Sequence, residues 1–139
     1  MGSVQKAAII GARFDLQTHI GKLCMNIQRL NPTSRWSDAT VYHGIAHFVE
    51  VPNNTDCPME EQVAQILAQA EVTLTAIGSD KSRLLSATIY ITHTGNVPIL
   101  NQAWETWLPA GCAPSRACVK VELLDPKMLI EIAFVAAVD

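Results

Sequence analysis

The sequence is short of charge and of aromatic side chains: charged residues make up 17% of its 139 residues and aromatic residues 6%. No stretch approaches the ~18 consecutive apolar residues of a membrane-spanning helix, which argues against insertion in a bilayer. The formal net charge is −3 at pH 7, and an acidic chain is a poor general binder of nucleic acid or anionic membranes. We therefore expect neither a nucleic acid nor a membrane as a partner.

Motifs for metals and phosphates are also missing. The chain has four cysteines, Cys24, Cys57, Cys112 and Cys118. They form no Cys-x-x-Cys pair and no other zinc spacing, which indicates reduced thiols in a cytoplasmic protein. The glycines are scattered, so no loop of the phosphate-cradling type is expected. The sequence thus predicts no metal and no cofactor.

Apolar residues, by contrast, are plentiful, at 49% of the chain. A chain of this length can bury one hydrophobic core, so we expect a single domain. The segment 1–24 shows no strong periodicity, and we interpret it as an N-terminal extension of uncertain role that precedes a domain spanning 25–139. The apolar excess further suggests that part of the surface is buried in an oligomer.

Hydrophobic periodicity divides this domain into eight elements. Strands are expected at 25–30, 36–43, 45–51, 83–93, 114–122 and 128–135. His43-Gly44 separates the second and third as a hairpin turn, and the fourth alternates Leu85, Ala87, Ile89 and Ile91 against polar residues. A long helix begins near Asp56 or Cys57 and ends at Gly78, and a second runs from Asn96 to Pro109. The long helix should bury the stripe Val63, Ile66, Leu67, Ala70, Leu74 and Ile77 and should expose the opposite, polar side: Glu60, Gln62, Gln65, Gln69 and Glu71.

This β-β-β-α-β-α-β-β order predicts an α+β fold, with a mostly antiparallel sheet and both helices on one face. The last strand is apolar on both sides. The helices can cover one side only, so the other predicts contact with a second subunit.

The C-terminal stretch contains the candidate functional residues. Two β-rich runs flank Asp125-Pro126, which predicts a hairpin in which Lys120 lies opposite Glu131. Arg116, Cys118 and Glu131 would then share one face, with Arg116 about 13 Å along the strand from the rung of Glu131. Two interpretations remain open: a structural ion pair between Glu131 and Lys120, or a functional site that needs a carboxylate at 131.

The pattern Pro114-Ser115-Arg116-Ala117-Cys118-Val119, with Ile130-Glu131-Ile132 following at a fifteen-residue Arg-to-Glu spacing, resembles the signature of the reactive intermediate deaminase (Rid, RutC-like or YjgF-type) family. The similarity extends from about Met25 to Val138, and Asn101 matches a helix asparagine of that family. The chain departs from the best-known branch in two places. It has Arg35-Trp36-Ser37 where that branch has Gly-Pro-Tyr, and Phe48-Val49-Glu50 where it has Ser-Gly-Gln, so the resemblance is to a divergent branch.

The resemblance implies a chorismate-mutase-like fold and homotrimers with clefts between neighbouring subunits. It also implies an activity, the hydrolysis of reactive 2-imino or 2-enamino acids to 2-keto acids and ammonia without a cofactor. In that reaction Arg116 would bind the substrate carboxylate, Glu131 would orient or deprotonate water, Cys118 would lie beside the imine carbon, and Asn101 would donate to the substrate or brace the pocket. One alternative is a non-catalytic trimer that binds a small carboxylate and has a regulatory or scaffolding role. A ribonuclease is a third, which the acidic balance disfavours.

Overall fold

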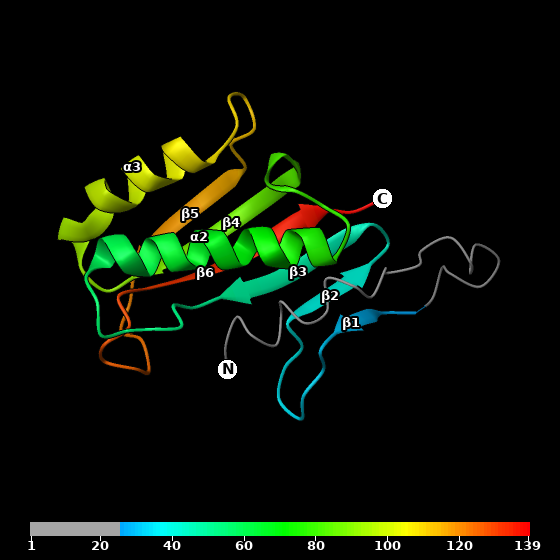
Figure 1. The fold of residues 1–139 in the computed structure, drawn as a ribbon, viewed down its shortest axis with the longest axis horizontal. Helices are drawn as coiled ribbons and strands as arrows, with labels where there is room; N and C mark the ends of the chain where they lie inside the picture. Colours follow the sequence, from blue (N-terminus) through cyan, green and yellow to red (C-terminus); the bar gives the residue numbers. More distant parts are fainter. Residues whose placement is uncertain (1–25) are drawn as a thin grey trace.

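The computed structural model describes residues 26–139, so the expected extension at 1–24 lies outside the described part of the chain. Eight main elements follow in the expected order (Figure 1): β1 (Gln28–Leu30), β2 (Ala39–Tyr42), β3 (Ile45–Glu50), α2 (Met59–Ala76), β4 (Leu84–Ile91), α3 (Val97–Trp107), β5 (Ser115–Lys120) and β6 (Ile130–Ala137). Short 3-10 turns precede β4 and α3. Within residues 26–139 no helix combines the length and apolarity needed to cross a bilayer.

The strands form one sheet in the order β1-β2-β3-β6-β4-β5. Its pairings are antiparallel except for the parallel pair of β4 and β5. The expected mostly antiparallel sheet is therefore confirmed, but the expected hairpin of the last two strands is wrong. Helix α3 carries the chain back to the starting end of β4, so β5 runs parallel to β4.

The position of each strand follows from its side chains. β6 is apolar on both faces and takes a central place, where both of its edges are paired. β5 carries Arg116 and Lys120, and all six of its residues are exposed at the free edge of the sheet. Charged side chains are common on edge strands because they discourage uncontrolled pairing.

The expected turn between the second and third strands is confirmed. His43 and Gly44 have φ values of 50° and 76°, which is the two-residue hairpin geometry that needs positive φ at both central positions. A Cβ atom at Gly44 would lie 3.1 Å from the carbonyl oxygen of Val138, so glycine also permits the close approach of the C-terminal backbone.

Both helices cover the same face of the sheet, as expected (Figure 1). The expected apolar stripe of α2 is buried throughout. Phe134 of β6 stacks on Phe48 of β3, with ring centroids 4.9 Å apart, and Trp104 of α3 stacks on the same ring at 6.3 Å. Trp104 thus belongs to the core.

Two details of burial differ from expectation. Gln62 and Gln69 were expected on the polar side of α2, but they are only 0% and 7% exposed and face the sheet and its loops. In β4 a bulge between Leu84 and Ser86 shifts the alternation, so Leu84 is buried and Leu85 is 44% exposed.

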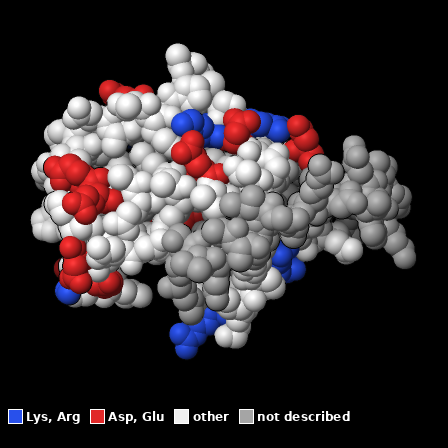
Figure 2. All heavy atoms as spheres, viewed as in Figure 1, with Lys and Arg blue, Asp and Glu red and all other residues white. Residues whose placement is uncertain are grey.

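Among residues 26–139, no helix lies on the second face of the sheet. Exposed apolar side chains lie on it, among them Val49 and Val119 at 51% and 43% exposure, with Ala133 and Val135 of β6 half-buried between them. We name this surface the open face. The helix-covered face differs in character, because patches of acidic side chains are visible on it (Figure 2).

Candidate functional site

Arg116 lies at the beginning of β5, on the free edge of the sheet. It pairs with the buried Ala87 of β4, so its side chain points to the helix-covered face. There its Nη2 donates a hydrogen bond of 2.8 Å to Oδ1 of Asn101, which α3 presents half-buried above the strand. The guanidinium is thereby oriented by one side chain on a rigid helix.

Most of the hydrogen-bonding capacity of Arg116 is left unused. Among residues 26–139, Asn101 is its only hydrogen-bond partner, and no carboxylate oxygen of these residues lies within 4 Å of it. A guanidinium has five N–H donors in a planar fork that matches a carboxylate. The side chain is exposed, so an anion from solution can reach the remaining donors.

Cys118 lies two residues further along β5 and on the same face as Arg116. Its backbone pairs with Ile89, another buried residue of the helix-covered face, and its thiol is exposed. The structure therefore brings together three of the four candidate residues, since Arg116, Cys118 and Asn101 belong to one exposed corner between β5 and α3.

Glu131 does not join them within one chain, which contradicts the expectation that Arg116, Cys118 and Glu131 share a face. It pairs with Tyr90 of β4, and Tyr90 pairs in turn with Val119, so its side chain points to the open face. Arg116 lies two strands away and three rungs along, a backbone separation of about 10 Å across and about 10 Å along the strands. One small acid cannot touch both side chains of the same chain.

The proposed ion pair of Glu131 with Lys120 is also wrong. Lys120 pairs with Ile91 and lies on the helix-covered face, while Glu131 is on the open face. The physical reason is the insertion of β4 between the two strands, which the assumed hairpin did not include. Glu131 is half-buried on a mainly apolar face.

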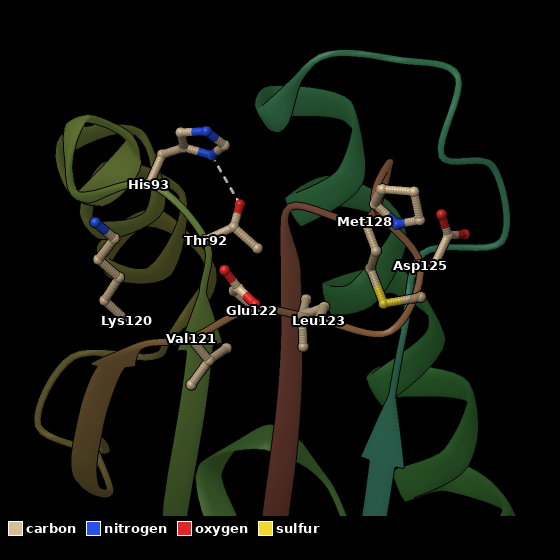
Figure 3. A pocket seen from close by; sticks show the side chains of 9 residues that line it. Thr92, His93, Lys120, Val121, Glu122, Leu123, Asp125 and Met128 are labelled. Carbon is tan, nitrogen blue, oxygen red and sulfur yellow. Dashed lines mark hydrogen bonds between the residues drawn. The ribbon is translucent and has the colours of Figure 1, made fainter.

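A pocket of about 620 Å³ opens at the far end of β4 and β5 (Figure 3). Its walls are formed by Thr92, His93, Lys120, Val121, Glu122, Leu123, Asp125, Pro126 and Met128. Lys120 and His93 lie on one side and Asp125 and Met128 on the other, with Glu122 between them. None of the four candidate residues lines it. Sequence patterns missed it because most of its walls come from the connection 121–129, which has no regular structure.

The position where the best-known branch has Ser-Gly-Gln is used differently here. Val49 points to the open face, whereas Glu50 is only 3% exposed and accepts a 2.6 Å hydrogen bond from Oγ1 of Thr73 on α2. Glu50 therefore faces the helix layer and does not line the corner around Arg116. Strand alternation places Glu50 on the same face as Ala46 and Phe48, and Thr73 supplies the hydrogen-bond partner that this burial needs.

The mixed sheet covered by two helices, with an arginine on its free edge, defines a protein of the chorismate-mutase-like α+β class. The comparisons with known proteins agree. The chain belongs to the RutC (YjgF-type) family: the family model described as endoribonuclease L-PSP matches residues 26–138. RutC family protein YoaB of Escherichia coli is 40% identical over 114 residues, which cover 82% of this chain and 100% of the relative. A RutC family protein of Haemophilus influenzae is 36% identical, with 81% and 98% covered.

Solved structures show the same relationship. A YjgF-family protein from Neisseria meningitidis superposes with a TM-score of 0.80 at 35% identity, covering 84% of this chain and 98% of the other. A structure from Salmonella typhimurium has a TM-score of 0.76 at 41% identity, covering 81% and 98%. The resemblance inferred from the C-terminal signature is thereby confirmed.

Proposed function

We propose that this protein hydrolyses reactive 2-imino and 2-enamino acids to 2-keto acids and ammonia, in clefts between the subunits of a cytoplasmic homotrimer. The observation that carries the proposal is the exposed Arg116 guanidinium, which Asn101 orients at 2.8 Å and which keeps donors for a substrate carboxylate. Membership in the RutC family supports it.

The reaction needs positioning more than activation, because an imine carbon is already electrophilic. Two parallel hydrogen bonds from Arg116 hold the carboxylate and thereby place the neighbouring imine carbon. Water adds to this carbon and its proton passes by way of a base to the nitrogen, which gives a carbinolamine. The hydroxyl group then loses its proton, the nitrogen takes up this second proton, and the C–N bond breaks to release ammonia and leave the keto group. Cys118 flanks the carbon, and the Asn101 amide braces the guanidinium.

Glu131 is our candidate for the group that orients or deprotonates water, and this role requires a second copy of the chain. Within one chain Glu131 lies on the open face and Arg116 on the covered one. Three observations favour assembly: the six exposed residues of β5 at a free edge, the apolar open face, and the half-buried carboxylate on it. A cyclic assembly can bring the free edge of one copy beside the open face of the next.

The proposal is tested with imines generated in place by an amino-acid oxidase, by measuring keto-acid and ammonia release against the uncatalysed rate. The protein should accelerate release, Arg116→Lys should lose most of the acceleration, and Glu131→Gln should lower turnover while sparing keto-acid affinity. If no imine is consumed faster than in buffer while pyruvate still binds, the non-catalytic carboxylate-binding trimer replaces the deaminase.

The description of the family model names an endoribonuclease, and this activity is tested separately. The acidic net charge and the acidic patches of the helix-covered face argue against binding of a polyanion (Figure 2). Incubation of the purified protein with single-stranded RNA should give no cleavage above background. Cleavage that disappears with Arg116→Lys would assign the same corner to a different substrate.

A further inference from the structure

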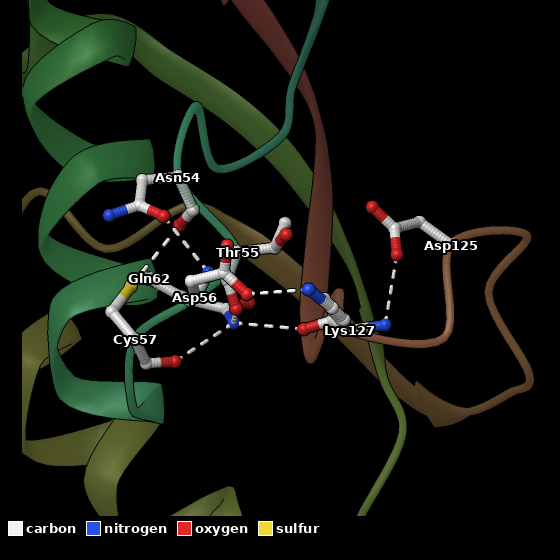
Figure 4. Close-up of polar contacts among 7 residues, drawn as sticks. All are labelled: Asn54, Thr55, Asp56, Cys57, Gln62, Asp125 and Lys127. Atoms are coloured by element: carbon white, nitrogen blue, oxygen red, sulfur yellow. Dashed lines mark hydrogen bonds and ion pairs between the residues drawn. The ribbon is translucent and has the colours of Figure 1, made fainter.

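Gln62 is a fully buried polar side chain at the beginning of α2, with an exposed fraction of 0%. Its Nε2 lies within hydrogen-bond distance of three carbonyl oxygens: those of Lys127 at 3.0 Å, Cys57 at 3.2 Å and Thr55 at 3.3 Å. Its Oε1 accepts a 2.9 Å hydrogen bond from the backbone N–H of Leu129. Both ends of one amide therefore join α2 to the connection between β5 and β6. Figure 4 shows the Nε2 end, which points to Lys127 and Cys57.

The backbone of Leu129 is held from two sides at the entrance to β6. Its N–H donates to Gln62, and its carbonyl oxygen accepts a 3.2 Å hydrogen bond from the N–H of Thr92, just beyond β4. Glu131 follows two residues later. The position of the Glu131 carboxylate along the open face thus depends on where Leu129 is held.

The rest of the connection 121–129 has weaker support. It contains neither helix nor strand. Its Lys127 Nζ lies 2.7 Å from Oδ1 of Asp56, and both side chains of this ion pair are exposed. Exposed ion pairs contribute little to stability, because water solvates the separated charges well. The hydrogen bonds of Gln62 are buried, where an unmade partner is costly, so they dominate the placement of this segment.

We propose that Gln62 is a positioning residue for Glu131, which sets the point at which β6 begins and thereby the placement of the Glu131 carboxylate on the open face. The inference rests on the proposed function, in which Glu131 handles water. A buried apolar residue would fill the same space, but it would not select one backbone position. Selection matters here because a one-residue slip of β6 would turn Glu131 to the helix-covered face.

The experiment compares Gln62→Met with Gln69→Met. Gln69 is a matched control: it is also buried on α2, but its Nε2 donates at 2.7 Å to Val51, on the loop after β3. Both variants should lose thermal stability. Only Gln62→Met should speed hydrogen exchange at Leu129 and lower kcat, by about ten- to a hundredfold, while the Kd for pyruvate stays within about twofold of the parent because Arg116 is untouched.

If Gln62→Met does not fold, Gln62→Glu provides a second test of the same hydrogen bonds. The ionised carboxylate can accept from Leu129 but has no proton for the three carbonyl oxygens, whereas the protonated form regains one donor. The activity of Gln62→Glu relative to the parent should therefore rise as the pH is lowered. A purely structural role predicts a constant ratio, and a constant ratio overturns the inference.

Two further results overturn it: parental kcat in Gln62→Met, or an equal loss of kcat in Gln69→Met at equal loss of stability. Failure of the proposed deaminase function can be distinguished from failure of this inference about Gln62. If the parent protein consumes no imine, the NMR chemical shift of the Glu131 side-chain carboxyl carbon decides the question. It should change in Gln62→Met and not in Gln69→Met, and an unchanged chemical shift in both overturns the inference without reference to turnover.

Discussion

Replacing Arg116 by lysine keeps the positive charge at the free edge of the sheet but removes the planar fork. In the structure one N–H of Arg116 is engaged by Asn101 at 2.8 Å, and the others are available to a carboxylate. A lysine ammonium presents a point charge and cannot make two parallel hydrogen bonds. The loss of one charged hydrogen bond costs about 1.5–3 kcal/mol, which corresponds to a Kd raised by roughly 10- to 150-fold.

The assay is calorimetric titration with pyruvate or 2-ketobutyrate, together with melting temperatures. Lys120→Arg is the matched control, because it also exchanges one cation for the other on the same strand and the same face. It should leave Kd unchanged. The melting temperature of Arg116→Lys should barely move, since an exposed side chain of this kind contributes at most about 1 kcal/mol to folding.

Asn101→Ala adds a second measurement on the same contact. Without Oδ1 the guanidinium is no longer held by α3, so keto-acid affinity should fall by less than in Arg116→Lys. The double variant should be no weaker than Arg116→Lys alone, because both changes act on one anchor. Binding of pyruvate by Arg116→Lys as tight as by the parent would refute the role of Arg116 as the carboxylate anchor, whatever the result for Asn101→Ala.

Four further outcomes are expected. Sedimentation should show a trimer, and a stable monomer at micromolar concentration would remove the shared cleft. Deletion of 1–24 should leave assembly and melting temperature unchanged, whereas a drop of several degrees would show that the segment is structural. Glu131→Gln and Lys120→Ala should have additive effects on stability, since they lie on opposite faces, and coupling in a double-mutant cycle would contradict the observed sheet order. Nη2 of Arg83 lies 2.8 Å from Oδ1 of Asp139, and this contact lowers the pKa of the Asp139 carboxyl below its ordinary 3.8. The pair therefore stabilises the fold above that pH, and this stabilisation is lost as the pH falls through the lowered pKa. The difference in free energy of unfolding between the parent and Asp139→Asn should vanish in acid.

Local patterns in the sequence determined most of the secondary structure. The period of 3.6 identified the buried stripe of α2, and the glycine after His43 identified a hairpin turn whose backbone needs positive φ. The pattern Arg116–Cys118 with Glu131 also identified the family correctly. These signals are readable because each depends on residues that are close together in the chain or at a characteristic spacing.

The site could be predicted only in part, because its geometry depends on strand order. Because β5 and β6 are neighbours in the chain, a hairpin between them was the simplest prediction. At the centre of the sheet, however, β6 can bury the apolar side chains of both its faces more completely. That placement moves Glu131 away from Lys120 and to the face opposite Arg116.

Burial of polar side chains was also decided by the tertiary structure. In the helical pattern Gln62 is equivalent to its exposed polar neighbours, yet the connection after β5 supplies carbonyl and N–H partners that allow it to be fully buried. A polar group can leave water only where partners from distant parts of the chain meet it. The sequence by itself determined which segments form helices and strands and which side chains are candidates for chemistry, and the tertiary structure alone decided which of them meet.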